Sequence, residues 1–323
     1  MNKYPDFRID NQWIISRRGE KNIVDPCRPY HFFTEEERLP DGTTGEVTTI
    51  LLTNRECPFR CLMCDLWKNT TDKTVRPGAI AEQISFALSR LRATKLVKLY
   101  NSGSFFDPGA ILPGDYEEIA RLVDHFETVI VESHPAFIGE NTILFHDMLK
   151  PDLQVAIGLE TVHEEILHML NKKMSLADFE HSVRFLNSNG IGTRAFILLR
   201  PPFLSEDEGV YWAKKSIDFA FGAGVSVCSI IPVRSGNGAL DVLTGAAYFS
   251  KPDIKSLETV IEYGIKLQTG TVFADLWDID RFSSCDRCLE LRKGRLKNMN
   301  LYQRVFPAIS CSCSGHIQPD SGN

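Results

Sequence analysis

Short apolar runs alternate with amphipathic stretches along most of the chain, and this alternation limits the possible folds more than any other feature. The candidate strands cover residues 47–52, 96–100, 129–132, 155–159, 195–199 and 225–231. Between them, the spacing of apolar residues predicts helices over 80–91, 116–126, 142–149, 176–189 and 209–221. Strands separated by helices pair in parallel through right-handed crossovers. The pattern therefore predicts an α/β fold, either a doubly wound sheet or a barrel.

The length of 323 residues allows one large catalytic domain with a small appendage. We expect an N-terminal extension over residues 1–44, a core over 45–250 and a C-terminal extension over 251–323. The chain start lacks the apolar core of a secretory signal, and no apolar run approaches the roughly 20 residues that span a bilayer. A cytoplasmic protein without a membrane contact is expected.

Seven of the nine cysteines fall into two groups. In a reducing compartment, clustered cysteines indicate metal binding rather than disulfides. The first group is Cys57, Cys61 and Cys64, with spacing Cys-x3-Cys-x2-Cys, directly after the first strand. Zinc normally takes four protein ligands, and no fourth Cys or His follows closely. Three thiolates in one loop can hold three irons of a 4Fe–4S cluster. The fourth iron is then open to S-adenosylmethionine (SAM), whose reductive cleavage releases a 5′-deoxyadenosyl radical.

At these residues the chain resembles the radical SAM superfamily, whose signature is Cys-x3-Cys-x-Φ-Cys, with Met63 at the Φ position. The resemblance covers about residues 45–250 and implies a partial (β/α)6 TIM-type barrel. It also implies that SAM contacts Met63 and the turn Ser102, Gly103 and Ser104 after the second strand. The segment after the fourth strand is similar to the branch with methylthiotransferases and the Elongator catalytic subunit. That similarity assigns Glu160, and Lys172 in place of an arginine, to the polar groups of SAM.

Arg194, near the start of the fifth strand, is a further candidate contact for SAM or for an anionic substrate. The sequence singles out no catalytic side chain. The implied chemistry requires an electron donor such as flavodoxin or ferredoxin.

The second cysteine group is Cys285, Cys288, Cys311 and Cys313, in two close pairs. Four thiolates predict either structural zinc or a second Fe–S cluster. We favour zinc, because a short appendage with few apolar residues needs such a staple.

The net charge of −6 is unevenly distributed, because segment 281–304 carries seven basic residues against two acidic ones. A basic segment on an acidic body is typical of a polyanion contact, although a solvated helix has the same composition. The whole-chain pattern is similar to the radical SAM family that contains archaeosine synthase β, which acts on a modified 7-deazaguanine in transfer RNA. That similarity rests on Ser-Gly-Ser-Phe, on Pro-Pro-Phe-Leu-Ser-Glu at 201–206 and on the cysteine-bearing tail.

These observations predict a radical SAM enzyme that modifies a tRNA nucleobase and holds the phosphates with segment 281–304. One alternative is radical chemistry on a peptide or a small metabolite. Another is a non-catalytic Fe–S electron carrier, which would need a closed four-ligand cluster.

Overall fold

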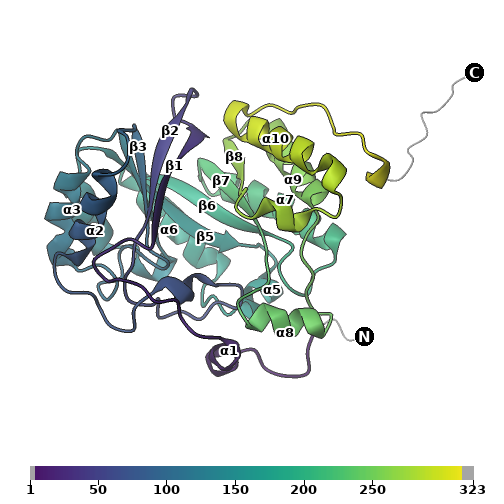
Figure 1. The fold of residues 1–323 in the computed structure, drawn as a ribbon, viewed down its shortest axis with the longest axis horizontal. Coiled ribbons are helices and arrows are strands. Elements are labelled where there is room, and N and C mark those ends of the chain that lie inside the picture. Colours follow the sequence, from purple (N-terminus) through teal and green to yellow (C-terminus); the bar gives the residue numbers. More distant parts are fainter. Residues whose placement is uncertain (1–3, 315–323) are drawn as a thin grey trace, which may run out of the picture.

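One curled sheet organises the described part of the chain, residues 4–314 of the computed structural model. Its strands are β1 (His31–Arg38), β2 (Thr44–Leu51), β3 (Leu96–Tyr100), β4 (Thr128–Glu132), β5 (Asp152–Glu160), β6 (Gly192–Leu199), β7 (Val227–Pro232) and β8 (Thr271–Ala274). Their order in the sheet is their order in the chain. β1 is antiparallel to β2, and every later pair is parallel. The result is an α/β half-barrel with its helices arranged around the sheet (Figure 1).

The α-helices connect these strands and extend to the C-terminal region. They are α1 (Asn11–Arg17), α2 (Ala79–Leu88), α3 (Tyr116–Leu122), α4 (Glu140–Met148), α5 (Glu164–Met169), α6 (Leu176–Ser188), α7 (Glu206–Gly222), α8 (Ala239–Gly245), α9 (Ile254–Leu267) and α10 (Asp286–Tyr302). The six predicted strands and five predicted helices are present, with ends shifted by a few residues. Within residues 4–314, no helix is both long enough and apolar enough to cross a bilayer.

Two strands were missed by the sequence analysis, and both lie in the regions expected to flank the core. β1 falls within the first 44 residues, and its sequence HFFTEEER contains three glutamates in a row. β8 has only four residues. A strand with so many charges, or so short, lacks the apolar pattern by which strands are found. Both flanking regions therefore contribute to the sheet.

Two of the β1 glutamates, Glu35 and Glu37, pair with basic side chains on the inner face of the half-barrel. Glu37 accepts hydrogen bonds from Lys98 on β3 and, at 3.0 Å, from Arg194 on β6. All three residues are buried. Burial alone would raise the pKa of Glu37, but the two cations outweigh it and lower this pKa to about 2. Charge pairing thus replaces apolar packing on this face of β1.

Helix α10 protects the free edge of β8. The Asn300 side chain donates to the Ala274 carbonyl and accepts from its N–H, at 2.9 and 2.8 Å. Gln303 forms the same pair of bonds with Val272, both at 2.9 Å. Two side-chain amides thereby satisfy backbone groups that another strand would otherwise bond, which guards an exposed sheet edge against aggregation.

Candidate functional site

The first cysteine group lies in the loop after β2, at the carboxyl edge of the parallel strands. Two segments hold this loop through its backbone. The Leu62 N–H donates to the Leu170 carbonyl at 2.9 Å, and the Asn171 side chain donates to the Arg60 carbonyl at 2.7 Å. From the loop between β7 and α8, Asn237 donates to the carbonyls of Leu62 and Cys64 at 2.7 and 3.2 Å. The backbone carbonyls of Arg60, Leu62 and Cys64 thus all accept hydrogen bonds from outside the loop, which restricts the positions of the cysteines.

The N-terminal segment braces the same loop. Glu56, just before the first cysteine, forms ion pairs with Arg18 at 2.7 Å and with Lys21 at 2.8 Å. On the other side, the ring of Phe59 stacks on His134, with centroids 3.8 Å apart. The first residues therefore support the motif rather than merely cover the barrel. Sequence analysis did not find these contacts, because the partners are far apart along the chain.

Burial dominates the chemistry of the loop thiols. It raises the pKa of Cys57 to about 11 and the pKa values of Cys61 and Cys64 to about 12. These thiols are therefore protonated at neutral pH, and any metal that binds them must displace the protons.

The predicted turn Ser102–Ser104 lies beside this loop. A Cβ on Gly103 would come within 3.2 Å of the Cys57 Cβ, so a larger residue would require the turn or the loop to shift. Glu132 at the end of β4 accepts from the N–H groups of Asn101 and Gly103, at 2.8 and 3.4 Å. The sequence analysis missed Glu132, although its position at a strand end was a usable signal.

Glu160 and Lys172 form a buried ion pair next to the loop. Burial opposes the charge of Lys172, but the Glu160 carboxylate outweighs it and raises the pKa of Lys172, with further contributions from Cys61 and Cys57. A side chain at Gly158 would overlap both charged groups. The structure thus brings the predicted pair together with the cysteine loop. Met63 is partly buried, in an apolar cluster that includes Leu62 and Ile166.

Arg194 does not join this group. It lies in the first half of β6, where it pairs with Glu37 and donates to Gln154 at 3.2 Å. Ligands of such folds bind at the opposite, carboxyl ends of the strands. Its place in the structure is that of an ion-pair partner inside the sheet.

Backbone strain gathers at the same edge of the sheet. Ser102 after β3, Glu160 at the end of β5 and Arg200 after β6 have φ values of 56°, 64° and 54°. Non-glycine residues rarely adopt this left-handed region, and such strain clusters at functional sites. Polar atoms of three buried residues there lack a hydrogen-bond partner among the described residues: Thr53, Asn54 and Asn101. This edge is therefore suited to a polar ligand.

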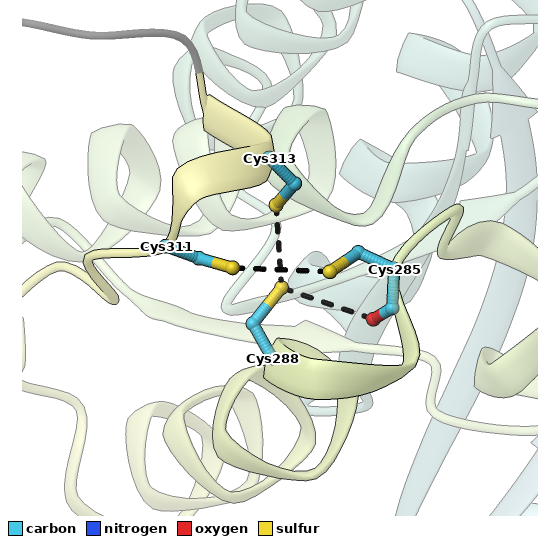
Figure 2. A group of neighbouring side chains, drawn as sticks. All are labelled: Cys285, Cys288, Cys311 and Cys313. Carbon is cyan, nitrogen blue, oxygen red and sulfur yellow. Dashed lines mark hydrogen bonds between the residues drawn. The ribbon is translucent and has the colours of Figure 1, made fainter.

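The second cysteine group converges at the start of α10, and we call it the cysteine knot (Figure 2). Its four sulfurs, from Cys285, Cys288, Cys311 and Cys313, all lie within 4.8 Å of one another. The Cys285 and Cys311 sulfurs are 3.8 Å apart, and those of Cys288 and Cys313 are 3.6 Å apart. This arrangement could hold a metal. A hydrogen bond from the Cys288 backbone N–H, together with hydrogen bonds from the other three thiols, lowers the pKa of Cys285 to about 6.

Part of the basic segment between the two cysteine pairs is buried and paired with acidic side chains. Arg292 and Arg295 are 4% and 5% exposed and pair with Glu258, and Arg295 also pairs with Glu262 at 2.7 Å. These two residues were expected to be presented to phosphates, and the structure corrects that expectation. Lys293 pairs with Asp280 at 2.7 Å and Lys297 with Glu36 at 3.2 Å. Helix α10 contacts β1, β8 and α9, away from α1 and α8 at the loop end of the barrel (Figure 1).

Comparison with solved structures decides the fold. The structure of methylornithine synthase matches with a TM-score of 0.52 at 13% identity, covering 78% of this chain and 69% of that one. Elp3 from the archaeon Methanocaldococcus infernus matches with a TM-score of 0.50 at 15% identity, covering 68% and 59%. This chain has the radical SAM fold.

Sequence relatives agree with that fold. The β subunit of archaeosine synthase from Thermococcus kodakarensis is 28% identical over 200 residues, which are 58% of this chain and 61% of that protein. The chain spans about three fifths to two thirds of the length of the curated relatives it matches. No protein-family model matches the chain.

Proposed function

We propose that the chain is a radical SAM enzyme in which Cys57, Cys61 and Cys64 hold one 4Fe–4S cluster. The observation that carries the proposal is the Cys-x3-Cys-x2-Cys loop at the carboxyl edge of a half-barrel of this fold. Among the described residues, these three sulfurs are not drawn together as tightly as those of the cysteine knot. Thiolates that bind separate irons of one cluster need not meet around one point, as the ligands of a single ion do.

The bound cluster would supply one electron to cleave the sulfonium of SAM. The chain's own groups would bind and orient that cofactor. The Glu160 carboxylate and the Lys172 ammonium offer opposite charges for its amino acid portion. The unpartnered Asn101 side chain offers a donor and an acceptor at the same edge. Glu132 holds the turn at 101–104 against the loop, which keeps these groups in register with the cysteines.

The substrate we propose is a nucleobase of tRNA, since a curated relative is named as a subunit of archaeosine synthase. Arg292 and Arg295 are buried, so they offer no support for a phosphate contact, and the proposal of a tRNA substrate rests on that relative. Radical chemistry on a peptide or small metabolite is the alternative. An electron donor such as flavodoxin or ferredoxin is part of the proposal.

The cysteine knot fits a single metal ion better than a second cluster. A zinc ion with Zn–S bonds of about 2.3 Å places tetrahedral sulfurs roughly 3.8 Å apart. The observed separations of 3.8 and 3.6 Å agree with this value. We therefore assign the knot a structural zinc that fixes the start of α10.

The test is anaerobic reconstitution with iron and sulfide, followed by an assay of 5′-deoxyadenosine formed from SAM with dithionite as the reductant. Cys61→Ala should abolish both the iron–sulfur absorption and the product, because one iron loses its ligand. Cys27→Ala, a lone cysteine outside both groups, is the matched control and should keep both. Full activity in the Cys61 variant would overturn the proposal.

A further inference from the structure

Three aromatic rings gather at the carboxyl edge of the sheet, where β1 and β8 face each other. His31 pairs with Leu51, the last residue of β2, which puts it at the same edge as the cysteine loop. Trp277 follows β8 and is 51% exposed. Its ring centroid lies 6.1 Å from that of His31 and 6.0 Å from that of Phe33, and the latter two are 5.3 Å apart. These contacts bridge the open side of the half-barrel.

A carboxylate continues this aromatic row toward the interior. His31, Phe33 and Glu35 alternate along β1, so their side chains share the inner face. Glu35 accepts from Lys98 at 2.9 Å and from Thr49 at 3.2 Å, yet its side chain is 44% exposed. Its carboxylate is therefore fixed in place while remaining reachable from solvent.

The loop that carries Trp277 is also held in place. Asp275 accepts from the Trp277 N–H at 3.0 Å and from Arg234 at 2.6 Å. The carboxylate of Asp275 thus ties the loop after β8 to the loop after β7. An exposed indole on a fixed loop has already lost much of its conformational freedom, which lowers the cost of stacking a ligand on it.

We propose that His31, Phe33 and Trp277 form a stacking platform for a planar base with adjacent N–H donors, as in guanine, and that Glu35 accepts from those donors. The inference rests on the proposed function, because it places the substrate base of that enzyme beside the cysteine loop. Enzymes that act on a base read it by stacking and by hydrogen bonds to its Watson–Crick edge. A carboxylate accepts only, so it favours guanine over adenine, which presents an acceptor next to its amino group.

Binding of guanosine and adenosine to the reconstituted protein, measured calorimetrically, tests the platform. Trp277→Ala should weaken guanosine binding about tenfold or more, because a stacking surface is lost. Trp277→Phe keeps a ring and should fall in between. Glu35→Gln should reduce the preference for guanosine over adenosine, which a merely structural role would not change. Tyr211→Ala removes an equally exposed ring (53%) on α7 and should leave binding unchanged.

The same titrations with unfractionated tRNA identify the source of the base. If Trp277→Ala binds both guanosine and tRNA more weakly than the wild type does, the platform holds a base within RNA. If it binds only guanosine more weakly, the platform holds a free nucleoside. Equal guanosine affinity in wild type and Trp277→Ala, or no guanosine binding by wild type, overturns the proposal. Formation of 5′-deoxyadenosine by the wild type is measured separately. If no 5′-deoxyadenosine forms but Trp277→Ala still weakens guanosine binding, the proposed function is wrong and the stacking platform is supported.

Discussion

The two cysteine groups of this protein differ in nearly every physical respect. The loop thiols of Cys57, Cys61 and Cys64 have pKa values raised to about 11 or 12 by burial. In the knot, backbone N–H groups lower the pKa values of Cys285 and Cys311. The knot sulfurs meet around one point, and the loop sulfurs do not form such a group among the described residues.

The difference shows that one chain can hold two groups of thiols in opposite electrostatic environments. In the knot, the Cys288 N–H at the start of α10 favours the thiolate of Cys285, and the Cys313 N–H favours that of Cys311. In the loop, hydrogen bonds from other segments go to backbone carbonyls and not to the sulfurs. Burial therefore keeps the loop thiols protonated. We expect the knot to take a metal readily and to hold structure, and the loop to depend on assembly of a cluster.

The largest expected effect is the complete loss of the zinc proposed for the knot, without loss of iron from the loop. Cys285→Ser with Cys313→Ser should remove the knot zinc while the reconstituted protein keeps about four irons per chain. The physical reason is that the two groups share no ligand. Elemental analysis of the purified variant measures both metals. If iron and zinc disappeared together in a variant that remained folded, the two groups would not be independent.

A large effect is also expected in thiol reactivity of the metal-free protein at pH 7. This pH lies above the pKa of Cys285, about 6, and below that of Cys57, about 11. Cys285 is therefore mostly thiolate and Cys57 mostly thiol, so iodoacetamide should modify Cys285 at least about a hundredfold faster. Raising the pH toward 11 should reduce the difference between the two alkylation rates, because Cys57 is then increasingly a thiolate.

Mass spectrometry of alkylated peptides measures these rates residue by residue. In concentrated urea the two cysteines should react alike, which separates the effect of the folded environment from that of the local sequence. Equal rates in the folded, metal-free protein would contradict the contrast between the two groups.

A smaller effect concerns a neighbour of the knot. Arg292 donates to the Cys288 sulfur at 3.4 Å and pairs with Glu258. Arg292→Met removes this donor and should weaken zinc affinity about 10- to 100-fold, the usual range for a group that supports a metal ligand. Competition with a chromogenic chelator measures it. Arg287→Met removes a more exposed arginine, bonded to Ser312 at 2.9 Å, and should change the affinity less. Equal losses of zinc affinity in the two variants would show that Arg292 has no specific role in supporting the knot.

Much of the core was predictable because its signals are local. Strands such as β3 and helices such as α6 follow from runs of apolar residues whose period matches one kind of element. The spacing of Cys57, Cys61 and Cys64 likewise marks a site within a few residues. The strand β1 was not predictable, because the partners of its buried Glu37 are Lys98 and Arg194, which lie on other strands far along the chain.

Residue order alone thus established the strand–helix alternation, the cysteine loop at a strand end and the two cysteine pairs of the tail. Whether the arginines of α10 are exposed or buried depends on how the helix packs. Arg292 and Arg295 have the composition of a phosphate-binding face, yet they are buried against Glu258 and Glu262 of α9. A charge pattern records which residues are basic, whereas their partners depend on how α9 and α10 pack together. Electrostatic pairing acts through space, and only the folded chain shows which charges are left for a substrate.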